Sequence, residues 1–150
     1  MNTRLSCLSL AGAALLLSAC SGEVEDTLPG QPIKHRQEAF KEILRQFEPF
    51  GEIAKQRAPD LDQAKAQASA LMAVRDVPWD YFTDDSNQPP TKALPALWQN
   101  RDDFDAKHED FIKATDALMS AAEEERVEDL KRAIGDVEQS CKACHKPYRR

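Results

Sequence analysis

Five consecutive residues near the C-terminus have the types and the spacing for one particular chemistry. Cys141 and Cys144 are three positions apart, and His145 follows directly. Cys-x-x-Cys-His is the attachment pattern for c-type haem. Residues i and i+3 share a helix face, so both thiols can add to the vinyl groups of one haem while the neighbouring imidazole binds the iron. The pattern therefore predicts one covalently bound haem c.

Three other uses of this motif can be weighed against haem attachment. A redox pair of cysteines would need a βαβ setting, whereas the residues before Cys141 have a helical pattern. A zinc site needs four ligands, and no second Cys or Cys/His pair lies nearby in the sequence to complete it. A disulfide between Cys141 and Cys144 is possible but leaves His145 without a role, so haem is favoured.

The N-terminus has the pattern of an export signal. Arg4 precedes a short apolar run over 8–17 that is too short to span a membrane as a stable helix. The run ends in Leu-Ser-Ala-Cys, which resembles a bacterial lipobox whose cysteine becomes the lipidated first residue. We expect a signal peptide over 1–19, lipidation of Cys20 and a periplasmic protein. Ordinary cleavage with Cys20 incidental is the alternative.

The remaining cysteines argue against a disulfide framework, and the net charge argues against one class of partner. Cys7 leaves with the signal and Cys20 takes the lipid, so no thiol is left for a disulfide framework. The formal charge of −6 becomes −7 when residues 1–19, with Arg4, are removed. This balance argues against nucleic acid as a partner. Ser21 after the cysteine favours sorting to the outer membrane, by resemblance to other lipoproteins, with the anchor as the only membrane contact.

Apolar residues recur at spacings of three and four throughout the rest of the chain, which indicates amphipathic helices. Asp60 is the expected N-cap of the second helix, and Pro49 should kink the first. We predict an all-α antiparallel four-helix bundle over 32–150, preceded by a flexible tether over 20–31, with a long crossover between the second and third helices. The expected segments are helices over 32–54, 61–77, 95–122 and 127–148, and an irregular crossover over 79–91.

The chain resembles the cytochromes c′ over residues 33–150. These proteins are a known example of the four-helix bundle, so the fold and the resemblance are not independent inferences. The most specific shared stretch is the attachment motif, with Tyr148 and Arg149 close behind it. Supporting stretches are Lys-His-Arg-Gln at 34–37, Val-Pro-Trp at 77–79, Phe82, Pro-Ala-Leu-Trp at 95–98 and Gly-Asp-Val at 135–137.

The resemblance implies a five-coordinate haem inside one end of the bundle. His145 would be its sole protein ligand, Arg149 would lie on the proximal side, and Phe40 would cap the open iron face. The family's haem-contacting positions correspond to Arg36, Gln37, Thr91 and Lys92, the first two commonly at a propionate. Members of the family often form homodimers, here through the helices expected over 32–54 and 61–77.

Few other side chains could fill the sixth iron position. The mature methionines, Met72 and Met119, lie outside the first helix. His35 points well away from Phe40 and is expected at the surface. His108 is expected as a hydrogen-bonded core or interface residue. Arg36 and Arg101 lie on apolar stripes; a propionate or a carboxylate should satisfy Arg36, while the role of Arg101 stays open.

We therefore expect a protein that binds small diatomic gases. An apolar Phe40 offers no hydrogen bond to bound oxygen, which favours nitric oxide and then carbon monoxide. The alternative is a one-electron carrier with a redox partner, although five-coordinate iron reorganises more on redox change. An enzyme such as a peroxidase lacks support, because no polar acid or base is visible next to Phe40.

Overall fold

A computed structural model gives the fold and describes residues 25–150. The expected signal peptide over 1–19 and the lipidation site Cys20 lie outside the described residues. Within the described part of the chain, no helix is long and apolar enough to cross a membrane.

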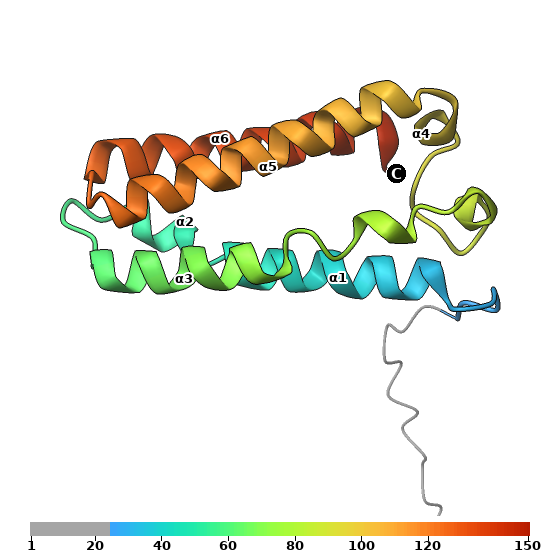
Figure 1. The fold of residues 1–150 in the computed structure, drawn as a ribbon, viewed down its shortest axis with the longest axis horizontal. Helices are drawn as coiled ribbons and strands as arrows, with labels where there is room; N and C mark the ends of the chain where they lie inside the picture. Colours follow the sequence, from blue (N-terminus) through green and yellow to red (C-terminus); the bar gives the residue numbers. More distant parts are fainter. Residues whose placement is uncertain (1–24) are drawn as a thin grey trace, which may run out of the picture.

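The described residues form an antiparallel four-helix bundle, which confirms the predicted fold class. Figure 1 shows α1 and α3 side by side in one layer and α5 and α6 in the other. The connection from α3 to α4 crosses from one layer to the other at the end of the bundle where the chain terminates. The elements are α1 (Pro32–Phe47), α2 (Phe50–Ile53), α3 (Leu61–Val74), α4 (Ala96–Gln99), α5 (Arg101–Glu123) and α6 (Val127–Tyr148), with short 3₁₀ helices η1 (Trp79–Tyr81) and η2 (Asp84–Asn87) in the crossover.

Two helices that the periodicity predicts as continuous are each divided in two. Pro49, which has no backbone N–H to donate, separates α1 from α2 as the sequence indicates. The helix expected over 95–122 is broken at Asn100, whose φ of −126° and ψ of 54° are not helical. The Asn100 side-chain amide donates to the carbonyl oxygen of Ala96 at 2.9 Å. Such local hydrogen bonds compete with continuation of the helix. The prediction of one continuous helix over 95–122 is therefore wrong.

The other predicted boundaries agree with the structure to within one residue, except that the helix expected over 61–77 ends at Val74. The Asp60 carboxylate accepts the backbone N–H of Gln63 at 3.0 Å, which confirms it as the N-cap of α3. The crossover over 79–91 lacks long elements, although η1 and η2 give it some regular structure.

The segment expected as a flexible tether is fixed to the bundle from Asp26 onward. The Asp26 side chain is buried, and its carboxylate accepts the backbone N–H groups of Leu28, Ile33 and Lys34 at 3.1, 2.7 and 3.1 Å. Two of these groups belong to the first turn of α1, where backbone donors lack helical partners. The packed domain therefore begins at Asp26 rather than at Pro32.

The larger apolar core lies away from the crossover. Ala64 and Ala68 of α3 are almost completely buried, as are Leu118 of α5 and Leu130 of α6. Small side chains on α3 let the opposite helices approach closely. A second cluster, at the crossover end, consists of Phe82, Leu97, Phe104 and Tyr148.

Candidate haem site

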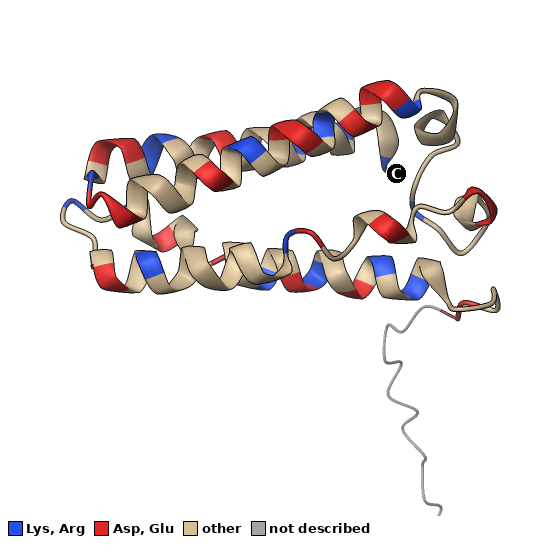
Figure 2. Ribbon diagram, in the orientation of Figure 1, with Lys and Arg blue, Asp and Glu red and all other residues tan. Residues whose placement is uncertain are grey.

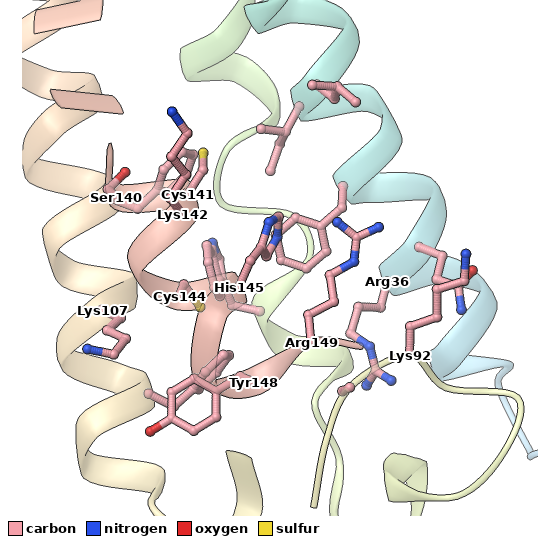
Figure 3. Close-up of a pocket in the computed structure, with 18 of the residues that line it drawn as sticks. Arg36, Lys92, Lys107, Ser140, Cys141, Lys142, Cys144, His145, Tyr148 and Arg149 are labelled. Atoms are coloured by element: carbon pink, nitrogen blue, oxygen red, sulfur yellow. The ribbon is translucent and has the colours of Figure 1, made fainter. Parts of the chain in front are cut away.

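A cavity of about 580 Å³ separates α1 from α6 at the crossover end of the bundle. Its volume is within the range of about 300–1,000 Å³ that is common for small-molecule and cofactor sites. Figure 3 shows side chains of α6 along one side, with Arg36 of α1 and Lys92 of the crossover on the other. All nine described residues that the sequence indicates for the site line this cavity: Arg36, Gln37, Phe40, Thr91, Lys92, Cys141, Cys144, His145 and Arg149.

The attachment motif lies near the C-terminal end of α6. Cys141 and Cys144 are free thiols on one helical face, and both side chains are partly buried. Cys141 packs against the larger core, whereas Cys144 packs against the cluster at the crossover end. Burial raises the pKa of Cys141 and raises that of Cys144 to about 11. Both thiols line the cavity one helical turn apart, so they could hold the two vinyl groups of one haem.

The imidazole of His145 lines the same cavity as the two thiols. Burial lowers its pKa, and the positive charge of Arg149 lowers it further. The ring is therefore neutral at neutral pH and retains a nitrogen lone pair. A neutral imidazole is the form that binds iron.

On the opposite wall, Phe40 presents an aromatic ring to the cavity. Its ring lies edge-on to those of Trp79 and Phe82, with centroids 5.5 and 6.1 Å apart. Gln37, three residues earlier on α1, has a buried Nε2 with no hydrogen-bond partner among the described residues. A buried donor without an acceptor is costly unless a ligand supplies one. This orphaned donor, the paired thiols and the neutral imidazole all fit a haem with carboxylate substituents.

Arg36 is almost completely buried, and crossover oxygens satisfy its guanidinium. Its Nη1 donates to the carbonyl oxygen of Tyr81 and the hydroxyl of Ser86, both at 2.9 Å. Its Nη2 donates to the carbonyl oxygen of Ser86 at 3.3 Å and to Thr91 Oγ1 at 2.7 Å. Burial lowers the pKa of Arg36 to about 10, which the Asp26 charge partly offsets. Arg36 therefore holds the crossover against α1, and its contact with haem stays a prediction.

The end of α6 is also joined to the crossover. The backbone N–H of Leu94 donates to the carbonyl oxygen of Tyr148 at 2.9 Å, and that of Arg150 donates to the carbonyl oxygen of Lys92 at 3.0 Å. These bonds flank a short bridge between Ala93 and Arg149. They explain how Lys92 and Arg149, far apart in sequence, line one cavity.

Tyr148 and Trp79 contribute to the cavity wall in ways that the sequence does not reveal. The Tyr148 hydroxyl donates to Asp103 Oδ2, and this bond raises the pKa of Tyr148 to about 12. Trp79 donates its indole N–H to the carbonyl oxygen of Arg75 at 2.8 Å. Tyr148 is four residues after Cys144, so helical spacing places it on the buried face of α6. Nothing in the sequence indicates that Asp103 of α5 is its hydrogen-bond partner.

The remaining candidates lie outside the cavity. His35 is exposed and pairs with Glu38 at 3.6 Å, which confirms it as a surface residue. His108 is half-buried, and burial lowers its pKa. It stacks on Trp79, and its buried Nε2 has no hydrogen-bond partner among residues 25–150, so the prediction of a hydrogen-bonded histidine is wrong for this part of the chain. Arg101 is exposed and pairs with Asp105 at 2.9 Å.

This arrangement defines a c-type haem protein built on an antiparallel four-helix bundle. A model of the cytochrome c′ family matches residues 31–149. The chain belongs to the cytochrome c′ family, whose members carry covalently attached haem c.

Individual relatives and solved structures agree with this assignment. Cytochrome c′ of Alcaligenes xylosoxydans xylosoxydans is 32% identical over 123 residues, covering 81% of this chain and 95% of the relative. Cytochrome c′ of Cereibacter sphaeroides is 33% identical over 142 residues, covering 91% of each. A nitric oxide complex of a variant cytochrome c prime from Alcaligenes xylosoxidans has a TM-score of 0.76 and 31% identity, covering 83% of this chain and 97% of that one.

Proposed function

We propose that this chain is a periplasmic haem c protein that binds small diatomic gases, chiefly nitric oxide and also carbon monoxide. The observation that carries the proposal is the composition of the cavity wall. Among the described residues that line it, His145 is the only histidine, and neither Met72 nor Met119 is present. His145 would therefore be the sole protein ligand of a five-coordinate iron.

The haem would supply the iron centre at which a gas molecule binds. The chain's own residues would attach it through Cys141 and Cys144 and offer one neutral nitrogen from His145. Phe40 would keep the opposite wall apolar, so that it donates no hydrogen bond to a bound ligand and resists the entry of water. The nitric oxide complex of the Alcaligenes xylosoxidans relative supports this choice of ligand.

Optical spectra test the proposal directly. The purified holoprotein should show high-spin ferric and ferrous spectra without added ligand, and both nitric oxide and carbon monoxide should convert the ferrous form to a new spectrum. A low-spin ferrous spectrum without ligand would show a second protein ligand and would contradict it.

Phe40→Ala tests the role of the distal wall. Carbon monoxide should bind the variant faster and more tightly, and nitric oxide affinity should change less because its bond to ferrous iron is stronger. Since Phe40 is only partly buried, we expect the variant to lose less than the ~3–5 kcal/mol typical of a fully buried ring. Equal carbon monoxide association rates in the two proteins would show that Phe40 does not control access.

Electron transfer is the second candidate function, and the charges at the cavity favour it. Acidic residues outnumber lysine and arginine by 26 to 20 in the chain, and both signs alternate along the long helices (Figure 2). Yet the exposed residues that line the cavity include Lys41, Lys92, Lys142 and Arg149, whereas Glu138 is the only acidic residue in the described part of the lining. An acidic redox partner would dock there. Electron transfer to such a partner should slow with rising salt.

We propose further that Cys20 carries lipid and holds the protein at the outer membrane. Cys20 and Asp26 are six positions apart, so the intervening chain reaches at most about 20 Å. Because Asp26 is fixed to the crossover end, this end would stay close to the lipid surface. Cys20→Ala should release the protein to the soluble periplasm, and unchanged membrane association would contradict lipidation.

A homodimer through α1 and α3 also stays a proposal. Leu44 on α1 and Val77 just after α3 are the large apolar residues that remain exposed among the described residues, at 55% and 47%. Sedimentation of a version without the lipid should give a dimer at tens of micromolar, and a monomer at that concentration would reject it.

A further inference from the structure

Trp79 of η1 is in ring contact with Phe40 of α1. The two rings meet edge-on with centroids 5.5 Å apart. Edge-to-face contacts of this kind restrict the position of a ring more than simple apolar burial does. Trp79 also lines the cavity itself, together with Phe82.

Two contacts besides the one with Phe40 hold the indole in place. Its N–H donates to the carbonyl oxygen of Arg75 at 2.8 Å. The Arg75 side chain in turn donates to Thr115 Oγ1 and Asp116 Oδ1 of α5, each at 2.6 Å. The His108 imidazole of α5 stacks on the indole with centroids 3.8 Å apart and an interplanar angle of 21°.

These contacts limit how far Phe40 could move towards Trp79. Such a movement of the Phe40 ring would require the Trp79 indole to move, and the contacts of the indole with Arg75 and His108 oppose that movement. The rings of Phe104 and Phe111 also contact the indole, with centroids 6.0 and 5.9 Å from it. Phe40, Trp79 and His108 thus form one continuous series of ring contacts from α1 to α5.

We propose that Trp79 is a positioning residue that sets how readily gas reaches the iron, because it holds Phe40 against the cavity. The inference rests on the proposed role of Phe40 as the distal wall. The rate at which gas reaches the iron would then depend on Trp79 of the crossover as well as on Phe40.

The chain offers a matched control in its second tryptophan. Trp98 is also partly buried and also donates its indole N–H to a backbone carbonyl, that of Thr83, at 3.1 Å. It contacts Phe82 at 6.4 Å but has no ring contact with Phe40, and it does not line the cavity. Replacing either tryptophan removes a similar ring, but only Trp79 supports Phe40.

The experiment measures carbon monoxide association with the ferrous holoprotein in six proteins: wild type, Phe40→Ala, Trp79→Leu, Trp79→Phe, Trp98→Leu and the Phe40→Ala/Trp79→Leu double variant. Trp79→Leu should speed association by about two- to tenfold, the factor that one edge-to-face pair represents. Trp79→Phe should recover part of the wild-type rate, and Trp98→Leu should match wild type. In the double variant, loss of Trp79 should add nothing to Phe40→Ala, because no ring is left to position.

A second readout separates positioning from a general loss of structure. In the diamagnetic carbon monoxide complex, aromatic NMR should show faster flipping of the Phe40 ring in Trp79→Leu than in Trp98→Leu. Equal rates for Trp79→Leu and wild type, or full additivity in the double variant, would overturn the proposal. If Trp79→Leu does not fold, Trp79→Phe carries the same test. If Phe40→Ala itself leaves association unchanged, the distal-wall function fails, and the role of Trp79 fails with it.

Discussion

The two ends of the bundle are held together by different forces. At the end away from the crossover, α3, α5 and α6 meet through apolar side chains with almost no exposed surface. At the crossover end, the helices stand apart around the cavity, and the apolar cluster contains four buried residues. Of the buried polar side chains in the described residues, Asp26, Arg36, Ser86 and Thr91 lie at this end, and Thr115 is the exception.

This difference shows how a bundle can make room for a cofactor. Apolar packing draws helices together and leaves no space larger than a water molecule. Hydrogen bonds from buried side chains can fix the direction of a segment without filling the space beside it. The Arg36 guanidinium and the Asp26 carboxylate have this role, so the cavity end is held by directional bonds and the far end by close packing.

Removing the two attachment cysteines should increase the difference between the two ends of the bundle more than any other change. In Cys141→Ala/Cys144→Ala, haem should extract completely into acid acetone, whereas wild type should retain it. Without haem, the amides at the crossover end should exchange hydrogen much faster than those of the far core, because the cavity then loses its filling. Ser140→Ala, which alters a neighbouring cavity residue without a thiol, is the control and should retain its haem. Equal amide exchange rates at the two ends of the haem-free bundle would contradict the inference that different forces hold them together.

Leu130→Ala should weaken the far end without touching the site. Leu130 has no exposed surface and belongs to the larger core. The substitution should lower the free energy of unfolding by about 2–5 kcal/mol, as is usual for a buried leucine. Denaturant unfolding of the holoprotein measures this loss, and the carbon monoxide association rate should stay at the wild-type value. A changed rate would mean that the two ends are coupled through the helices.

The sequence predicts the parts of the molecule that depend on local spacing. Helix periodicity, the break at Pro49 and the Asp60 cap all arise from residues within one or two turns, and the structure confirms them. The attachment motif is likewise five consecutive residues. In contrast, the oxygens that bind Arg36 lie 45 to 55 positions away, on an irregular segment without periodicity. The Asp26 cap could not be predicted either, since its carboxylate reaches over an intervening turn to Ile33.

Arg36→Met should loosen the crossover while leaving the far core intact. The variant keeps an apolar stem but removes the donors to Tyr81, Ser86 and Thr91. We expect a loss of about 3 kcal/mol, the scale of one or two net hydrogen bonds to a charged group. Amide exchange over 81–91 should accelerate most. Arg45→Met is the control, because Arg45 is exposed and pairs only with nearby Glu42, and it should change stability by less than ~0.5 kcal/mol. Equal effects of the two substitutions would show that burial of the guanidinium contributes nothing.

The smallest expected effect concerns the charge of Asp26. Burial alone would raise the pKa of Asp26, but the backbone N–H bonds and the Arg36 charge together lower it. A carboxyl with a lowered folded pKa stabilises the fold fully above its unfolded value, about 3.9, and loses that contribution as the pH falls through the folded pKa. Asp26→Asn keeps one capping oxygen but removes the charge and one of the two acceptor oxygens, so the variant should be less stable by about 0.5–1 kcal/mol at pH 7.

The same difference should begin to shrink below about pH 4, because the unfolded carboxyl is protonated first, and should be lost once the pH falls through the lower folded pKa, where the folded carboxyl is protonated and resembles the amide. Urea unfolding of the holoprotein at pH 7 and pH 3 measures both values. Glu25→Gln, which removes the exposed neighbouring charge, should leave stability within ~0.5 kcal/mol of wild type. A difference between Asp26→Asn and wild type that is as large at pH 3 as at pH 7 would mean that the amide disturbs the cap itself. In that case the ionised carboxylate would have no part in holding the crossover end.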